Sequence, residues 1–313
     1  MPNLKKLQKL IIILGPTASG KTNLAIRLAK KLAPYRTCSG RGFYGVEIVS
    51  ADSRQVYKGM DIGTAKPTKK EMRSIPHHLV DIIYPDQEFN VAIYKKMALI
   101  AIKNIRRREK LPFLVGGTGL YIRAIVENID FPKVPPQKKL REKLEKETEK
   151  ELFKIYKKLD PEGAKFIERE NKRRLIRAIE VCEATKKPFW QQRKKGEPLF
   201  NVLQIGIKLS KKELKERVEK RIEKMFKMGL EKEVKNLSKK YGFKIAPMRT
   251  IGYQEWQEYF KGKINKEEVK KRIVLHTLQF VRRQMTWFKR EKRIKWIKNY
   301  QQAEQLIREF IRN

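Results

Sequence analysis

The sequence predicts an α/β protein whose parallel sheet is interrupted by an inserted helical domain. Three features of the 313 residues support this prediction. Short apolar segments alternate with amphipathic ones, a glycine-rich motif directly follows the first apolar segment, and a charged segment with helical spacing separates two stretches of this alternation. Because alternating strands and helices form parallel sheets covered on both faces, we expect a buried sheet with loops at its ends.

The first half of the core is expected within residues 1–130. Residues 10–14 are apolar and β-branched, which predicts a buried strand. Leucine and alanine then recur at helical spacing from Leu24 to Leu32, which predicts one face of a helix. Further elements follow in order: strands at residues 46–49, 79–83 and 112–115, and a helix at residues 91–105.

The pattern changes after Pro132. Residues 131–200 are charged and carry apolar side chains at helical spacing, so we expect a helical insertion there. Residues 201–313 are expected to complete the core and to end in helices. Their elements are a strand at 202–209, a helix opened by the capping box of Ser210 and Glu213, and a second helix at about 265–288.

Composition narrows the possible classes of protein. The chain has 75 basic and 35 acidic residues, a net charge of +40, which favours a polyanionic partner, although a general lysine-rich bias would give the same excess. No apolar run approaches the roughly 20 residues of a membrane span, so we expect a soluble, cytoplasmic protein. The cysteines Cys38 and Cys182 and three histidines fit no zinc motif, and two reduced thiols are expected.

A phosphate-binding motif lies between the first strand and the first helix. It matches Gly-x4-Gly-Lys-Ser/Thr, and its residues are Gly15, Pro16, Thr17, Ala18, Ser19, Gly20, Lys21 and Thr22. Backbone N–H groups, the helix N-terminus and Lys21 would hold a di- or triphosphate, and Thr22 has the hydroxyl expected to bind Mg²⁺. The core is therefore predicted to be P-loop NTPase-like, acting either as a kinase or as a transferase that attacks carbon and releases diphosphate.

Two polar residues follow other strands at the same predicted edge of the sheet. Asp52 follows the strand at 46–49, and Thr118 follows the strand at 112–115. Ligands of open α/β sheets bind at this edge. Asp52 could bind a metal ion, act as a general base or cap a turn, and Thr118 could face the ligand or bond to its own turn.

Seven segments, in this order, resemble the tRNA dimethylallyltransferases, which are also called tRNA isopentenyltransferases (IPP transferases). The first is the phosphate motif, which many NTPases share, but six further matches in register are far more specific. The segments are residues 15–22, 50–57, 60–67, 76–81, 114–121, 249–253 and 282–288. The resemblance covers nearly the whole chain and implies a P-loop core with a tRNA-binding helical insertion.

The resemblance also implies a reaction. A dimethylallyl group would pass from dimethylallyl diphosphate, with Mg²⁺, to the N6 amine of adenosine 37 in the tRNA anticodon stem-loop. Asp52 would accept the amine proton, Thr118 would position the base or the diphosphate, and Arg249 would neutralise diphosphate beside Lys21. This amine is a poor nucleophile because its lone pair is delocalised, so a positioned base and an oriented electrophile would both help.

The resemblance further implies a set of tRNA contacts. They are Asp52, Ser53, Arg54, Gln55, Thr118, Arg141, Arg173, Arg174, Arg177, Arg249, Gly252, Tyr253, Arg282, Arg283 and Gln284. Arg272, His276, Gln279 and Arg283 share one face of the late helix, which suits an RNA backbone but also an ordinary solvated surface. Tyr57, Tyr121 and Tyr253 could hold the extruded base or belong to the core.

Two departures and three alternatives accompany this resemblance. Residues 35–45 lengthen a connection that is short in the family, and the sequence lacks the zinc-finger tail of eukaryotic members, so we expect the bacterial form, acting as a monomer. The alternatives are a small-molecule P-loop kinase, a dimethylallyltransferase acting on free adenine nucleotides, and a nucleotide-governed RNA-binding switch.

Overall fold

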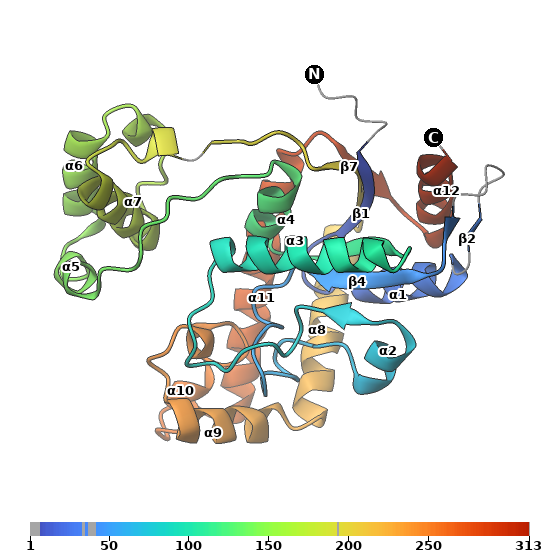
Figure 1. The fold of residues 1–313 in the computed structure, drawn as a ribbon. Coiled ribbons are helices and arrows are strands. Elements are labelled where there is room, and N and C mark those ends of the chain that lie inside the picture. Colours follow the sequence, from blue (N-terminus) through green and yellow to red (C-terminus); the bar gives the residue numbers. More distant parts are fainter. Residues whose placement is uncertain (1–6, 33–34, 37–41, 193, 313) are drawn as a thin grey trace. The chain divides into compact units, whose positions relative to one another are not determined.

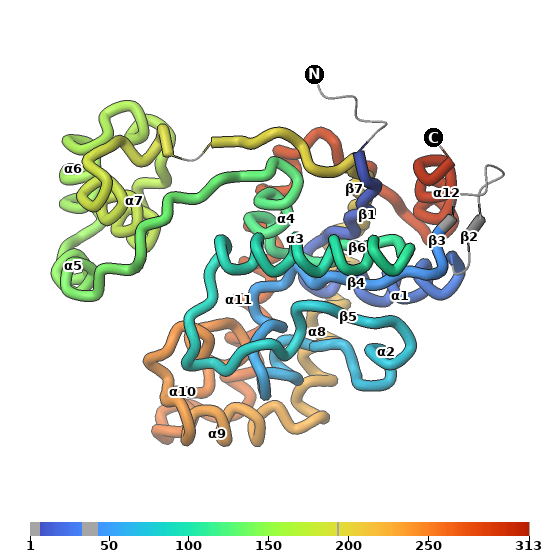
Figure 2. The backbone as a smooth tube through the Cα atoms, viewed as in Figure 1, coloured from blue at the N-terminus to red at the C-terminus, as the bar shows by residue number. Residues whose placement is uncertain are grey.

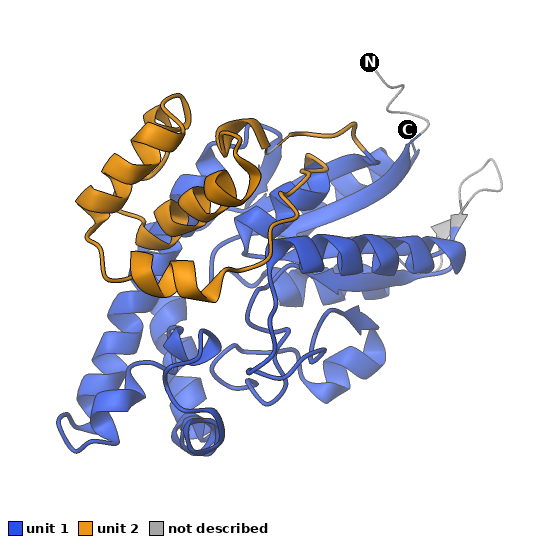
Figure 3. Ribbon diagram, turned by 60° about the vertical axis from the view of Figure 1, so that its left-hand side comes forward, with its two compact units in different colours: residues 1–126, 199–313 blue, residues 127–198 orange. Residues whose placement is uncertain are grey.

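The computed structural model describes residues 7–32, 35–36, 42–192 and 194–312. The chain divides into two compact units, residues 1–126 with 199–313 and residues 127–198 (Figure 3). The first unit is the α/β core, and the second overlaps the helical insertion expected at 131–200. No helix in the described ranges combines the length and apolar character needed to cross a bilayer.

A six-stranded sheet forms the centre of the core unit. Its order is β5-β4-β6-β1-β7-β8, and every neighbouring pair is parallel (Figure 2). The strands are β1 (Gln8–Leu14), β4 (Val46–Ser50), β5 (His77–His78), β6 (Leu111–Gly116), β7 (Phe200–Ile207) and β8 (Ile294–Ile297). The chain leaves this unit after residue 126 and returns at residue 199, so that β7 pairs directly with β1. The α/β fold predicted from the alternating pattern is confirmed.

Helices cover both faces of this sheet because successive side chains of β1 point to opposite faces. Ile11 and Ile13 pack with α1 (Lys21–Lys31) and α12 (Tyr300–Arg312). Leu10, Ile12 and Leu14 pack with α3 (Val91–Arg107) and α4 (Gly119–Val126). Figure 1 shows α3 running along the sheet. An uninterrupted apolar strand is what burial on both faces requires.

A third apolar cluster joins the later helices to the loop that follows β4. The helices are α8 (Lys211–Lys227), α9 (Leu230–Tyr241), α10 (Trp256–Tyr259) and α11 (Lys266–Lys289). Val56 and Met60, from the loop after β4, are fully buried against Val218 of α8 and Trp256 of α10. This packing holds the segment after β4, which carries Asp52, against the C-terminal part of the chain.

The second unit contains α5 (Lys138–Leu144), α6 (Glu149–Leu159) and α7 (Lys172–Thr185) around its own apolar cluster. Leu152 and Tyr156 of α6 are buried with Leu175 and Ile179 of α7. Thr148 begins α6 with a reciprocal capping box to Glu151. This unit is therefore a small helical domain with an independent core.

One predicted strand is wrong. Residues 79–83 were expected to form a strand, but β5 occupies only His77–His78, and a loop follows it. Leu79 and Asp81 have φ values of 62° and 56°, in the left-handed region that a strand does not use.

Residues 35–45 contribute the short antiparallel pair β2 (Tyr35–Arg36) and β3 (Gly42–Phe43), while Cys38 lies outside the described residues. The remaining short helix of this region is α2 (Lys69–Ser74).

Candidate active site at the carboxyl end of the sheet

The phosphate motif forms the loop between β1 and α1. Ala18 and Gly20 have φ values of 64° and 87°, which turn the backbone sharply before the helix begins. Gly20 caps α1 without a side-chain hydrogen bond, and the first turn of α1 has no acidic residue. The Ser19 hydroxyl is buried without a partner among the described residues. A helix start with open backbone donors is suited to an anion.

Lys21 and Thr22 begin helix α1 beside this loop. The Lys21 ammonium donates to the Pro16 carbonyl at 3.3 Å. Burial lowers the pKa of Lys21 to about 8, the negative charge of Asp52 opposes this shift, and the positive charge of Arg221 adds to it. Lys21 is thus a cation that a bound anion would favour.

Asp52 lies in the loop that follows β4 and interacts electrostatically with Lys21. Its Oδ1 accepts backbone hydrogen bonds from Arg54 at 2.8 Å and Gln55 at 3.4 Å, whereas Oδ2 has no hydrogen-bond partner in the described ranges. One carboxylate oxygen therefore caps a turn, and the other remains able to accept a proton. Of the three interpretations of Asp52 considered from the sequence, the structure shows the turn cap, and the roles as base or metal ligand stay predictions.

Thr118 connects the loop after β6 to the loop after β4. Its backbone N–H donates to the Ala51 carbonyl at 3.1 Å, and its hydroxyl accepts from the Ser53 backbone N–H at 3.1 Å. Gly116 permits this approach, because a Cβ atom there would lie 2.2 Å from the Ala51 carbonyl oxygen. Thr118 and Asp52 are consequently held in adjoining, hydrogen-bonded loops.

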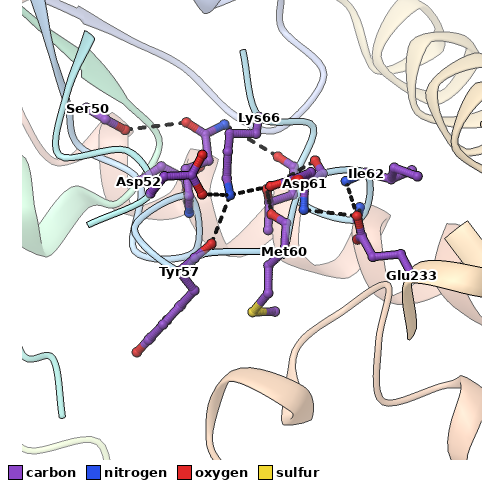
Figure 4. A network of polar contacts seen from close by, with 12 residues as sticks. Ser50, Asp52, Tyr57, Met60, Asp61, Ile62, Lys66 and Glu233 are labelled. Carbon is purple, nitrogen blue, oxygen red and sulfur yellow. Dashed lines mark hydrogen bonds and ion pairs between the residues drawn. The ribbon is translucent and has the colours of Figure 1, made fainter. Parts of the chain in front are cut away.

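A polar network fixes the rest of the segment after β4 (Figure 4). Glu233 of α9 accepts backbone hydrogen bonds from Asp61, Ile62 and Gly63 at 2.7–3.0 Å. Lys66 pairs with Asp61 and Asp81 and donates to the Tyr57 carbonyl. These contacts anchor residues 57–66 to a helix far away in sequence.

Gln55 belongs to this structural network. Its side chain is buried, accepts from Ser50 at 3.4 Å and donates to the carbonyls of Thr64 and Ala65. Ser53 and Arg54, its neighbours in the predicted RNA-contacting segment, are half-buried. The side chain of Gln55 is thus held within the loop by hydrogen bonds, whereas Ser53 and Arg54 lie nearer the surface.

Helix α8 supplies two arginines that the sequence did not single out. Arg217 donates to the Ser19 carbonyl at 3.2 Å, and Arg221 donates to the Thr64 carbonyl at 3.2 Å. Burial lowers the pKa of Arg221, and the charge of Asp52 opposes that shift. Their spacing of four residues places them on one helix face, but in a lysine-rich helix this signal is indistinguishable from an ordinary solvated face.

The Arg-Thr-Ile-Gly-Tyr segment, residues 249–253, combines an exposed arginine with residues held by hydrogen bonds. Arg249 is exposed, and its side chain makes no ion pair or hydrogen bond within the described ranges. Gly252 has a φ of 93° and donates to Glu255, and Tyr253 is fully buried, donating to Glu233 at 2.7 Å. Two further cations, Arg217 and Arg221, come from α8, and the role of Arg249 beside Lys21 stays a prediction.

The tyrosines considered for holding a base lie in the core. Tyr57, Tyr121 and Tyr253 are 5%, 6% and 0% exposed. Tyr121 stacks on Tyr94 with 3.9 Å between the ring centroids, and burial raises the pKa of both hydroxyls. Of the interpretations left open by the sequence, their burial favours a packing role.

The predicted RNA-contacting residues of helix α11 differ in their exposure to solvent. Arg282 and Arg283 are exposed, whereas Gln284 is buried. Earlier on the same helix, Arg272 pairs with Glu258 and Glu268, and His276 contacts Glu255 at 2.7 Å. The row of polar residues expected along α11 is therefore partly occupied by intramolecular ion pairs.

The arginines of the helical unit also fall into two groups, those held in ion pairs with a buried carboxylate and those exposed to solvent. Arg141 and Arg177 both contact Glu180, whose carboxylate is completely buried and also accepts from the Gln137 backbone N–H. Two arginines remain nearer the solvent: Arg173 is exposed, and Arg174 is exposed and 3.5 Å from Glu168. Arg141 and Arg177 thus have a structural role within this unit.

The parallel sheet with a Gly-x4-Gly-Lys-Thr loop after β1 defines a P-loop protein, a class whose loop is suited to a polyphosphate at the carboxyl end of the strands. The family model for IPP transferases matches residues 55–291. Two relatives named tRNA dimethylallyltransferase cover nearly the whole chain: that of Pelotomaculum thermopropionicum is 41% identical, covering 100% of this chain and 98% of the relative, and that of a Thermoanaerobacter species is 42% identical, covering 97% and 96%. The chain belongs to the IPP transferase family.

Solved structures agree with this assignment. The tRNA isopentenylpyrophosphate transferase of Bacillus halodurans superposes with a TM-score of 0.69 at 33% identity, covering 98% of this chain and 96% of that one. A eukaryotic dimethylallyltransferase acting on tRNA gives a TM-score of 0.77 at 25% identity, covering 93% of this chain and 74% of that one. The P-loop core and the family resemblance predicted from the sequence are confirmed.

Proposed function

We propose that this protein transfers a dimethylallyl group from dimethylallyl diphosphate to the N6 amine of adenosine 37 in the anticodon stem-loop of tRNA. The bond between the allylic carbon and the diphosphate oxygen breaks, and a carbon–nitrogen bond forms. The amine loses one proton, and diphosphate leaves. The products are N6-dimethylallyladenosine in tRNA, diphosphate and a proton. The names of the relatives, which modify tRNA, support this substrate pair.

One observation carries the proposal: Asp52, in the loop after β4, is close enough to Lys21, at the start of α1, for its negative charge to raise the pKa of that ammonium against the effect of burial. Lys21 is suited to diphosphate, and the second oxygen of Asp52 is suited to the amine proton. A general base in this position contributes about 10²–10⁴-fold to a rate. The adjoining Thr118 would help to position the base or the diphosphate.

The donor diphosphate would lie in the loop formed by residues 15–22. Negative charge grows on its oxygens as the allylic carbon departs, and preorganised donors stabilise that charge. Lys21 would supply one cation, and Arg217 and Arg221 of α8, which donate to the Ser19 and Thr64 carbonyls, would act together with Arg249. This assignment adds the two arginines of α8 to the role that the resemblance gave to Arg249.

A magnesium ion fits the same site. The described residues include no cluster of three or more carboxylate, histidine or cysteine ligands, but Thr22 begins α1 next to the place of the diphosphate. Mg²⁺ commonly binds through one or two protein groups together with substrate phosphates and water. Thr22 would therefore hold the ion jointly with the diphosphate, and Mg²⁺ would neutralise charge on the leaving group.

The tRNA is expected to contact the exposed basic residues of each unit. Candidates that the structure leaves at the surface are Arg173, Arg174, Arg249, Arg282 and Arg283. One chain contains the phosphate loop, the carboxylate and these basic residues, so we expect a monomer to be sufficient. A tRNA substrate also accords with a cytoplasmic location.

The direct test is to incubate the protein with tRNA, dimethylallyl diphosphate and Mg²⁺, digest the RNA and measure the masses of its nucleosides by mass spectrometry. We expect one adenosine to gain a five-carbon prenyl group, and mass mapping of the RNA fragments to locate it next to the anticodon. Prenylation of free adenosine phosphates with untouched tRNA would favour the nucleotide-specific alternative. Phosphoryl transfer from ATP, with intact dimethylallyl diphosphate, would contradict the proposal.

A further inference from the structure

The end of helix α11 contacts both glycine-rich loops of the candidate active site. Gln284 lies on its last turns, with a side chain that is 7% exposed, although its neighbours Arg282 and Arg283 are exposed. A buried glutamine directly after two exposed arginines has a different environment from an RNA-contacting residue. Its hydrogen bonds show what it contacts instead.

The side-chain amide of Gln284 bridges two loops. Its Oε1 accepts a hydrogen bond from the Thr17 backbone N–H at 2.9 Å, and its Nε2 donates to the Gly117 carbonyl at 2.9 Å. Only an amide offers an acceptor and a donor in this arrangement without carrying charge. A Cβ atom on residue 117 would lie 2.6 Å from that Nε2, so Gly117 leaves the space that the amide occupies.

A second residue of α11 contacts the same loop one helical turn later. A Cβ atom on Gly119 would lie 2.4 Å from the ring of Trp287, so this ring packs directly against the glycine backbone. Gln284 and Trp287 are three residues apart and thus share one helix face. The helix therefore contacts residues 117–119 at two points, on either side of Thr118.

We propose that Gln284 is a positioning residue for prenyl transfer, holding the phosphate loop at a fixed distance from the loop that carries Thr118. The connection continues to the proposed base, because the Thr118 hydroxyl accepts from Ser53, the residue after Asp52. Electrophile and base are thereby tied through Thr17, Gln284 and Gly117. This proposal rests on the function proposed above and replaces the RNA contact that the resemblance implied for Gln284.

The test is the variant Gln284→Met, which keeps the length of the side chain and removes both hydrogen bonds. We expect inorganic diphosphate to bind more weakly and kcat to fall by about 10²-fold, the effect of displacing reacting groups by about 1 Å. The dissociation constant for tRNA should stay at the wild-type value. Gln301→Met, the same change at an exposed position of α12, is the matched control and should alter neither quantity.

Three outcomes would overturn the proposal. A lower melting temperature with unchanged kcat and diphosphate affinity would make Gln284 a stabilising residue only. Weaker tRNA binding with unchanged diphosphate affinity would restore the RNA contact. Should Gln284→Met fail to fold, Gln284→Asn retains the amide but can reach only one partner, and wild-type kinetics in that variant would also refute positioning. A wild-type protein that binds diphosphate but prenylates nothing would contradict the proposed function alone, since the diphosphate affinity of the variants still tests the bridge.

Discussion

Buried charge is balanced differently at two places in the molecule, the phosphate site of the core unit and Glu180 of the helical unit. In the core unit, burial lowers the pKa of both Lys21 and Arg221, and they share the single negative charge of Asp52. In the helical unit, burial raises the pKa of Glu180, but hydrogen bonds from Arg141, Gln137 and Arg177 outweigh it and the net shift is downward. The phosphate site of the core thus keeps an excess of buried positive charge, whereas the charge of Glu180 is compensated by two guanidinium groups.

This difference distinguishes a binding site from a structural ion pair. Groups held in the less favourable ionisation state are common where a ligand of opposite charge binds. A buried carboxylate with two guanidinium partners has no such need, and removing either side leaves an uncompensated charge. Basic residues that were both predicted to contact a ligand, Lys21 the diphosphate and Arg177 the tRNA, are therefore expected to respond differently to substitution.

The largest effect is expected at Asp52. Asp52→Asn keeps an oxygen that can accept from the Arg54 and Gln55 N–H groups, so the turn should persist while the proton acceptor is lost. We expect kcat for prenyl transfer to fall by about 10²–10⁴-fold. Single-turnover kinetics with bound tRNA would measure this effect directly.

Asp52→Ala serves as the comparison, because it removes the turn contacts as well. Both variants should bind tRNA and diphosphate, since neither ligand depends on this proton acceptor. Near-normal transfer by Asp52→Asn would show that the carboxylate is not the base.

The next effect is expected on stability, at the buried carboxylate of the helical unit. Glu180→Gln removes the buried charge and leaves the partly exposed Arg141 and Arg177 without a counter-charge, so we expect a loss of stability smaller than the loss of about 3–5 kcal/mol for a fully buried broken pair. Hydrogen exchange should therefore accelerate in α6 and α7. Because the folded pKa of Glu180 lies below its ordinary value of 4.5, its stabilisation is present above that value and is lost as pH falls through the folded pKa.

The matched comparison is Arg177→Ala against Arg173→Ala on the same helix. Of these two arginines only Arg177 contacts Glu180, so only its loss should accelerate exchange. Equal protection in both variants would remove the structural role assigned here. Diphosphate affinity, a property of the core unit, should not change in either.

The contrast between the units also explains what sequence could reveal. The phosphate motif and the loops around Asp52 and Thr118 require particular backbone shapes, which leave glycine and short polar residues at recognisable spacings. Arg217 and Arg221 are part of a helix rich in lysine, and nothing local indicates that they point toward Ser19 and Thr64. Such roles depend on the packing of α8 against the sheet's loops, a long-range property that spacing does not encode.

The same limit applied to residues inferred from the resemblance. Gln55 and Gln284 lie in segments that match RNA-contacting regions, yet both side chains are buried and bonded to backbone groups. Alternation along a helix or loop sends adjacent residues in different directions. A matched segment therefore indicates a region, while burial decides which of its side chains can reach a ligand.

A moderate effect of pH is expected on diphosphate binding. Lys21 has a pKa of about 8 instead of 10.5, so it is protonated below pH 8 and progressively neutral above it. Affinity for diphosphate should be full below about pH 8 and then fall by up to about tenfold per pH unit. Calorimetry between pH 7 and 9 would show this, and Lys21→Met should remove the part of the dependence due to the lysine. The stability of the ligand-free protein should instead increase as pH rises over the same range. Lys21 has the higher pKa in the unfolded state, which therefore binds more protons there.

The smallest effect is expected at an exposed arginine of the helical unit. Arg173 has no ion pair among the described residues, so Arg173→Ala should leave stability unchanged and remove one phosphate contact at most. The affinity for tRNA should fall a few-fold, and the slope of log K against log salt should decrease by about one. Filter binding over a range of salt concentrations measures both. An unchanged slope, together with a reduced slope for Arg282→Ala in the core unit, would assign the RNA contacts to the core and leave the charge of Arg173 as a solvated surface feature.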